Sequence, residues 1–154
     1  MITPELKRII EENTIGFVAT VTPDGAPHVS PKATMICLDA NHIAFCDIRS
    51  PDTVRNIRVN PRVEICFIDI FRRIGCRLKG KAVYREQGSP EFKALCATFN
   101  RWEPLLERAG GFVVIEVESA KKVTSPAYDL GQSEASLIEY WLGFYNELHQ
   151  PEEA

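Results

Sequence analysis

The sequence predicts a mainly β protein, an antiparallel barrel with helices added around it, and three observations predict this class. Six β-rich segments follow one another at short intervals along the 154 residues. Helical patterns interrupt only some of these intervals, without the regular strand and helix alternation of a doubly wound sheet. The composition, 45% hydrophobic and 25% charged, is that of an ordinary globular domain with a sizeable core. We therefore expect one domain over residues 1–154, α+β by content.

Charge and segment length argue against two classes of partner. The formal net charge of -3 and the pI near 5.7 leave no basic excess to neutralise a nucleic-acid backbone. The longest apolar runs, such as Ile15 to Val21 and Phe112 to Val117, are far shorter than the roughly 20 residues that a membrane span needs. The charged segment from Met1 to Asn13 has no apolar signal core. We expect a soluble cytoplasmic protein that binds neither nucleic acid nor membrane.

The first third of the chain is expected to form a helix and three strands. Leu6, Ile9 and Ile10 share one helical face after Pro4, which predicts an amphipathic helix over residues 4–13. A β-branched and aromatic run then meets the turn sequence Thr22-Pro23-Asp24-Gly25, which predicts a hairpin. Its second arm is expected over residues 27–38, and a third strand follows the turn at residues 39–41 and covers residues 43–48.

The middle of the chain opens on a clear helix start. Ser50-Pro51-Asp52 supplies an N-cap residue, a proline at the first helical position and an acid in the first turn. Asn60-Pro61 ends this helix, and Val63, Ile65 and Phe67 alternate in a fourth strand. A fifth strand follows with strict alternation. Its inward residues are Ile74, Cys76, Leu78, Gly80, Ala82 and Tyr84, and its outward residues are Arg77, Lys79, Lys81 and Arg85.

The last third combines a capped helix, a sixth strand and a C-terminal helix. Ser89-Pro90-Glu91 starts the helix, which carries Phe92, Leu95, Cys96 and Phe99 on one face. Gly110-Gly111 introduces the strand over residues 112–118. A helical extension over residues 133–149 carries Leu137, Tyr140, Trp141 and Phe144 at helical spacing, a face that needs cover from water. The final residues, Gln150 to Ala154, are expected to fray.

Four local sequences, taken in order, indicate a family. They are the hairpin of residues 16–32, the Arg49-Ser50 step before a helix, the strand entry Asn60-Pro61-Arg62-Val63, and Leu78-Lys79-Gly80-Lys81-Ala82. Together they resemble the FMN-binding split β-barrels related to pyridoxamine 5'-phosphate oxidase, over about residues 5–120, although each alone is a weak signal. The resemblance implies a six-stranded antiparallel split β-barrel with peripheral helices. It also implies a homodimer with FMN in a groove between the two subunits.

The resemblance further implies which residues hold FMN. Ser30, Pro31, Lys32 and Ala33 would run along the isoalloxazine and ribityl edge, Asp47 would lie beside it, and Arg49, Ser50 and Thr53 would hold the phosphate. The phosphate assignment has an independent reason, because a helix N-terminus favours anions and an adjacent arginine adds a bidentate donor.

One position departs from the family pattern. Asp52 stands where many relatives have a lysine or arginine, and a carboxylate in the first helical turn would repel the phosphate. Two explanations remain open. Either Lys32 or Arg73 supplies the missing charge, or Asp52 only complements the helix dipole and faces away.

Each candidate also has a simpler structural explanation. Ser50 and Thr53 could serve helix capping alone, and Lys32 could be a solvated strand lysine. His28 would be a proton donor, or an axial ligand if the groove held haem, but a strand-surface histidine is more usual. Trp102 and the aromatic residues of the C-terminal helix are read as core or dimer interface. No histidine has metal-ligand spacing, and the five cysteines show no disulfide or metal pattern, so no metal site and reduced thiols are expected.

These observations leave three function hypotheses. The first is an FMN-dependent oxidoreductase that passes electrons between a reduced nicotinamide or small organic donor and an acceptor, with the chemistry supplied by the flavin. The second is a non-catalytic flavin-binding or electron-carrier protein, and the third a haem or deazaflavin binder. Pyridoxamine phosphate oxidation itself is not expected, because the chain has no arginine after Lys122. The sequence assigns no catalytic residue and no particular small-molecule substrate.

Overall fold

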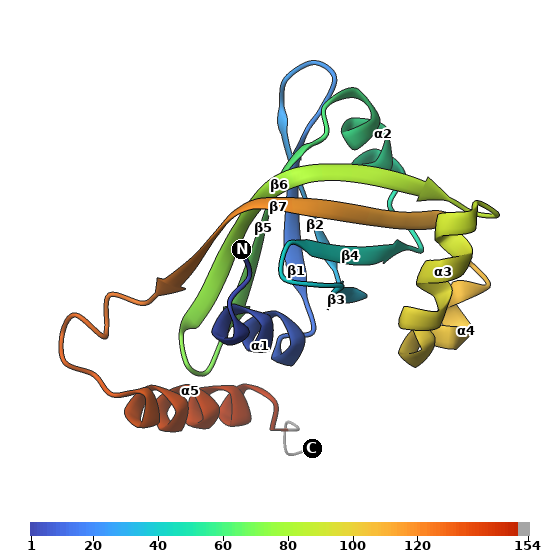
Figure 1. Cartoon of the computed structure of the whole chain (residues 1–154). Helices are drawn as coiled ribbons and strands as arrows, with labels where there is room; N and C mark the ends of the chain where they lie inside the picture. The colour runs from blue at the N-terminus through green and yellow to red at the C-terminus, as the bar shows by residue number, and fades with distance from the viewer. Residues whose placement is uncertain (151–154) are drawn as a thin grey trace.

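The protein forms one curled antiparallel sheet of seven strands with helices around it, in a computed structural model that describes residues 1–150 (Figure 1). The spatial order of the strands is β2-β1-β5-β6-β7-β4-β3. The strands are β1 (Gly16–Val21), β2 (Pro27–Lys32), β3 (Met35–Cys37), β4 (His42–Asp47), β5 (Arg62–Asp69), β6 (Ile74–Glu86) and β7 (Gly111–Thr124). The predicted class, an antiparallel split barrel with peripheral helices, is confirmed. The expected fraying of the end of the chain falls almost entirely on residues 151–154, outside the described residues.

The strand count differs from the expected six because the second arm of the hairpin divides. β2 pairs with β1 up to Lys32, whereas β3 pairs with β4 at the opposite edge of the sheet. Thr34 lies between them, and its hydroxyl both accepts from the backbone N–H of Cys46 at 3.1 Å and donates to the Cys46 carbonyl at 3.2 Å. The Thr34 side chain thus ties the chain to β4 at this point. The two halves of the predicted strand therefore become the two edges of the split.

Two hydrophobic clusters lie on opposite faces of β4 and β7. Ile43, Phe45, Val113 and Ile115 face the inside of the curled sheet, where Ile65, Phe67 and Leu78 also pack. Ala44, Cys46 and Phe112 face outward and pack against Phe92 and Phe99. Because β4 is covered on both faces, it is a continuous apolar run rather than an alternating one. This rigid strand ends at Asp47, next to the candidate site.

A β-bulge between Lys79 and Gly80 accompanies the curl of the two longest strands. A Cβ atom at Gly80 would lie 2.1 Å from the carbonyl oxygen of Glu116, so only glycine allows β7 to approach this closely. A bulge increases local twist and bends the strand. It therefore helps the sheet to close around its core.

Five α-helices surround the sheet in the described residues, and most of their starts follow the predicted signals. They are α1 (Pro4–Glu12), α2 (Pro51–Val59), α3 (Pro90–Thr98), α4 (Glu103–Leu106) and α5 (Glu134–Leu148), with the 3-10 turn η1 (Asn100–Trp102) between α3 and α4. Ser89 caps α3 through its side chain, as expected, and Ser133 caps α5 in the same way. α5 lies apart from the strands, beyond the turn that joins β5 to β6 (Figure 1). No helix among residues 1–150 is long and apolar enough to span a membrane.

Candidate functional site

The start of α2 carries two largely buried residues with hydroxyl side chains. Ser50 occupies the N-cap position and is buried, but its side chain accepts no hydrogen bond from the helix backbone. Thr53, one turn on, is 2% exposed. The serines at the starts of α3 and α5 behave differently, because each accepts a backbone N–H bond. The pure capping explanation of Ser50 therefore does not describe this structure, and the first N–H groups of a nine-residue helix remain available beside it.

Lys32 is a buried cation at the end of β2. Its side chain has only 7% of its surface exposed, its Nζ donates to the hydroxyl of Ser30, and it lies 5.8 Å from the ring centre of Phe45. Burial lowers the pKa of Lys32, and the negative charge of Asp47 partly offsets this effect. The solvated-lysine explanation is thus not what the structure shows. A buried ammonium group with one neutral hydrogen-bond partner favours an additional anion nearby.

Asp47 ends β4 and is held from two sides. Its carboxylate accepts a hydrogen bond from the Tyr84 hydroxyl at 2.8 Å, and its carbonyl accepts from the backbone N–H of Gly110 at 2.9 Å. Burial, followed by this hydrogen bond, raises the pKa of Tyr84, which therefore remains a neutral donor. The guanidinium of Arg58 on α2 lies 5.2 Å from the Tyr84 ring centre. Tyr84 and Arg58 are neighbours of the site that the sequence did not single out.

A polar group behind α2 also escaped the sequence analysis. Asn56 is fully buried, its amide donates to the Thr20 hydroxyl at 3.0 Å, and that hydroxyl lies 3.2 Å from Nδ1 of His28. The remaining oxygen of the Asn56 amide is buried without a hydrogen-bond partner among the described residues. The available signal was an asparagine between Val54 and Ile57 on the inward face of the helix. This group fixes α2 on the β1–β2 hairpin.

The structure brings some of the predicted residues together. Ser30 and Lys32 are hydrogen-bonded, Lys32 and Asp47 interact through their charges, and Ser50 and Thr53 share the first turn of α2. Pro31, Ala33 and Arg49 are exposed. In the described part of the chain, no hydrogen bond or ion pair engages the side chain of Arg49, so it is placed beside the helix start but not fixed there.

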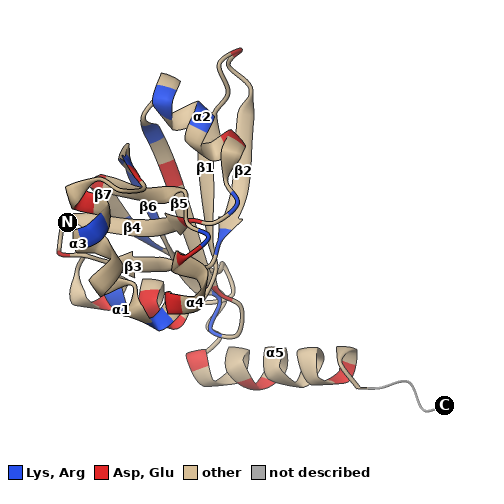
Figure 2. Cartoon of the chain, turned by 90° about the vertical axis from the view of Figure 1, so that its right-hand side faces the viewer, with Lys and Arg blue, Asp and Glu red and all other residues tan. Residues whose placement is uncertain are grey.

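The two explanations for Asp52 can now be compared. Asp52 forms a 2.8 Å ion pair with Arg55, and both side chains are more than half exposed. Its negative charge is therefore paired on the surface of α2, the helix that also carries Arg58 (Figure 2). Arg73 belongs to the β5–β6 turn, at the opposite end of the molecule from α2 (Figure 1). Of the two residues that could replace the missing positive charge at position 52, Lys32 lies near the other candidate residues and Arg73 does not, within one chain.

The residues of this site suit the binding of an anion, and the cysteines near it are poor nucleophiles. Burial raises the pKa of the Cys46 thiol to about 12 and that of Cys76 to about 12, so neither is a thiolate at neutral pH. Residues 1–150 contain no cluster of three side chains suited to a metal ion. Hydroxyl side chains at a helix N-terminus and a largely buried lysine nearby fit a cofactor that carries a phosphate.

The family is shown by comparison with known proteins. The model of the pyridoxamine 5'-phosphate oxidase family matches residues 2–123. The chain belongs to this family, and the predicted resemblance is confirmed. No curated protein is significantly similar to the chain.

Solved structures show the same fold. HupZ from Group A Streptococcus is 28% identical with a TM-score of 0.71, and the match covers 81% of this chain and 96% of that chain. An FMN-binding protein from Syntrophomonas wolfei is 11% identical with a TM-score of 0.62, covering 78% and 84%. HutZ, a haem storage protein from Vibrio cholerae, is 21% identical with a TM-score of 0.60, covering 80% and 94%. The descriptions of the last two proteins name different ligands, FMN for one and haem for the other.

Proposed function

We propose that the protein binds FMN and serves as an FMN-dependent oxidoreductase for a small-molecule substrate. The phosphate is held at the start of α2 by Ser50, Thr53 and Arg49 together with the backbone N–H groups of the first turn. The segment Ser30, Pro31, Lys32 and Ala33 lies along the ring and ribityl chain, with Asp47 at its side. Bound FMN supplies the redox chemistry, and the chain positions it.

The observation that carries this proposal is the start of α2, where Ser50 is a largely buried residue whose hydroxyl does not cap its own helix. The Ser50 hydroxyl is therefore free to bond a ligand, and a helix N-terminus with free donors is a common phosphate site. The start of α2 would attract the phosphate electrostatically, because the partial positive charge of the helix and the Arg49 guanidinium act on the same anion. Family membership and an FMN-binding relative of the same fold support the same conclusion.

The arrangement of charges gives Lys32 and Asp47 separate roles in this proposal. Lys32 places a buried positive charge at the end of β2, and the FMN phosphate or the reduced ring gives that charge the anion it lacks. Asp47 is held by the neutral Tyr84 hydroxyl and so keeps a fixed orientation. These are positioning and electrostatic roles, and no described residue is proposed as a catalytic acid or base.

We also propose that a second copy of the chain completes the groove. α5 leaves Tyr140 64% exposed, Phe144 41% and Leu148 60% in a single chain. Neighbouring exposed aromatic and aliphatic groups of this kind are unusual on a monomer, and a closed twofold pair is the commonest cover. Sedimentation at low micromolar concentration, followed at a flavin wavelength, should show a dimer that carries FMN. A monomer that retains FMN would refute the shared groove.

Cofactor identity is tested by the visible absorption spectrum of the purified protein and by reconstitution. The protein should take up FMN in preference to FAD, with a flavin spectrum. A Soret band in the purified protein, or uptake of haem but not FMN, would replace the flavin proposal by the haem alternative. Uptake of FMN without turnover of any nicotinamide or small organic donor would favour the electron-carrier alternative.

A further inference from the structure

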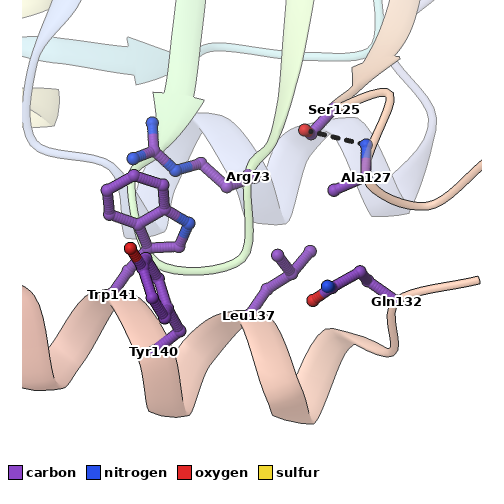
Figure 3. A pocket seen from close by; sticks show the side chains of 7 residues that line it. All are labelled: Arg73, Ser125, Ala127, Gln132, Leu137, Tyr140 and Trp141. Atoms are coloured by element: carbon purple, nitrogen blue, oxygen red, sulfur yellow. Dashed lines mark hydrogen bonds between the residues drawn. The ribbon is translucent and has the colours of Figure 1, made fainter. Parts of the chain in front are cut away.

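A hollow of about 340 Å³ lies between the β5–β6 turn, the loop after β7 and α5 (Figure 3). It is distinct from the groove at the start of α2. Polar donors line one part of it and apolar side chains the rest. Its lining residues are Arg73, Ser125, Ala127, Gln132, Leu137, Tyr140 and Trp141. None of these is acidic, and Arg73 is the only cation among them.

Two adjacent arginines have different surroundings here. Arg72 is matched by three carboxylates, with Glu12 at 2.7 Å, Asp69 at 3.4 Å and Glu134 at 3.6 Å. Arg73 forms no ion pair with any described residue, and its Nε is buried without a hydrogen-bond partner. Its guanidinium instead lies over the Trp141 ring, with Cζ 3.4 Å from the ring centre (Figure 3). The turn thus leaves one arginine charge unmatched, and that charge borders the hollow.

The backbone at Arg73 is a second, independent observation. Its φ is 56°, and it is the only residue other than glycine with positive φ among the described residues. Glycine adopts this conformation without steric cost, whereas arginine does not. Residues held in such conformations cluster at functional sites. An arginine in a place that suits glycine indicates that its side chain serves a purpose other than forming the turn.

The other polar groups of the hollow still have donors to offer. The Ser125 hydroxyl oxygen accepts the Ala127 N–H at 3.2 Å, so its own proton is free to be donated. The Gln132 side-chain oxygen accepts from Ser136 at 3.4 Å, which leaves the amide NH₂ group. Both donors border the same space as the Arg73 guanidinium (Figure 3).

We propose that this hollow binds a small organic carboxylate whose apolar body packs on Leu137 and Tyr140. A single arginine balances the single charge of a carboxylate and can hold it through two parallel bonds. A phosphate dianion would require further positive charge, which the lining does not provide. The volume lies within the range of small-molecule sites. This inference concerns a separate site, and its outcome does not depend on whether the chain binds FMN.

The test uses the full chain as purified, with benzoate as the probe and benzamide as its neutral counterpart of the same shape. Calorimetry gives the affinity, and tryptophan fluorescence of a Trp102→Phe variant reports on Trp141 alone, because the chain has two tryptophans. Benzoate should bind saturably and alter the Trp141 emission, and benzamide should bind at least about tenfold more weakly.

Two arginine variants, at positions 73 and 77, allow the role of Arg73 to be compared with that of an arginine outside the hollow. Arg73→Met should weaken benzoate at least about tenfold, whereas Arg77→Met, on the exposed face of β6, should leave it unchanged. Arg73→Gly relieves the backbone and provides a second variant if the methionine variant does not fold. Equal binding of benzoate and benzamide, or benzoate binding that survives loss of Arg73, would overturn the proposal. Inorganic phosphate that binds more tightly than benzoate, displaces benzoate and is weakened by Arg73→Met would also overturn it.

Discussion

The Tyr84 hydroxyl donates a 2.8 Å hydrogen bond to the carboxylate of Asp47, and this contact joins β6 to the end of β4 just before α2. The contact links the β5–β6 hairpin, the longest in the sheet, to β4, the strand that leads into the candidate phosphate site. Because Asp47 is also held through its carbonyl, the approach to Ser50 is fixed at two points. The position of the helix start is therefore a property of the sheet and not of a free loop.

Tyr84→Phe should lower the free energy of unfolding by about 1 to 2 kcal/mol at neutral pH, the usual range for a partly exposed bond to a charged acceptor. The pKa of Tyr84 is raised by burial and by Asp47. The contribution of the Tyr84 hydrogen bond to the free energy of unfolding is therefore fully present below about pH 10, the pKa of an unfolded tyrosine. It is lost as the pH rises further. Urea unfolding at several pH values measures both effects, with the exposed Tyr140→Phe as control. An unchanged alkaline slope in Tyr84→Phe would contradict this assignment.

Ser50→Ala should leave the unfolding free energy nearly unchanged and weaken FMN binding. The reason is that the Ser50 side chain does not cap α2, whereas Ser89 caps α3. The matched variant Ser89→Ala should cost about 1 kcal/mol of stability and leave FMN affinity intact. Urea unfolding and FMN titration of both variants measure the contrast. If Ser50→Ala proved the less stable of the two, Ser50 would be a structural cap after all.

Arg49→Ala should weaken FMN far more than riboflavin, because only FMN carries the phosphate. A charge-assisted contact contributes roughly 1.5 to 3 kcal/mol, so a loss of about 10- to 150-fold is expected for FMN alone. Arg8→Ala on α1 is the control, since Arg8 is paired with Glu12 away from the start of α2. Fluorescence titration with each flavin gives the two ratios. Equal losses for FMN and riboflavin would show that Arg49 does not contact the phosphate.

Lys32→Met should raise the stability of the cofactor-free protein while weakening FMN. Burial lowers the pKa of Lys32, so the folded state binds this proton less tightly than the unfolded chain. Its contribution to stability therefore rises with pH between the lowered folded pKa and the unfolded value near 10.4. Thermal unfolding of both proteins across this window should show that the substitution removes the dependence. If Lys32→Met were less stable than the wild type without FMN, burial of the Lys32 charge would not be the larger effect on stability.

Local signals predicted most elements of the fold because these elements depend on neighbours in sequence. The starts of α3 and α5, the turn at Gly25 with its φ of 89° and the alternation of β6 all follow from such signals. The division at Thr34 was not predictable in this way, because it depends on bonds to Cys46, twelve residues away. The sequence marks a β-prone segment but not the partner to which each half is bonded.

The site was predictable only in part for the same reason. The helix start at Ser50 was visible, but whether its hydroxyl caps the helix depends on tertiary packing. The Tyr84 to Asp47 bond and the Asn56 group link residues 36 or more positions apart. Arg73 was considered as a phosphate ligand, and the structure places it instead against Trp141 at the other end of the sheet. Long-range contacts of this kind leave no periodic signal in a single sequence.

A calorimetric titration of the full chain with FMN tests the central claim most directly, with FAD and riboflavin as comparison ligands. The account predicts saturable binding at micromolar concentration or below, with one FMN for each chain and weaker binding of both other flavins. The adenylate of FAD would crowd the phosphate site at α2, and riboflavin lacks the phosphate altogether. The absence of FMN binding at micromolar concentration, or riboflavin binding as tight as that of FMN, would contradict the account.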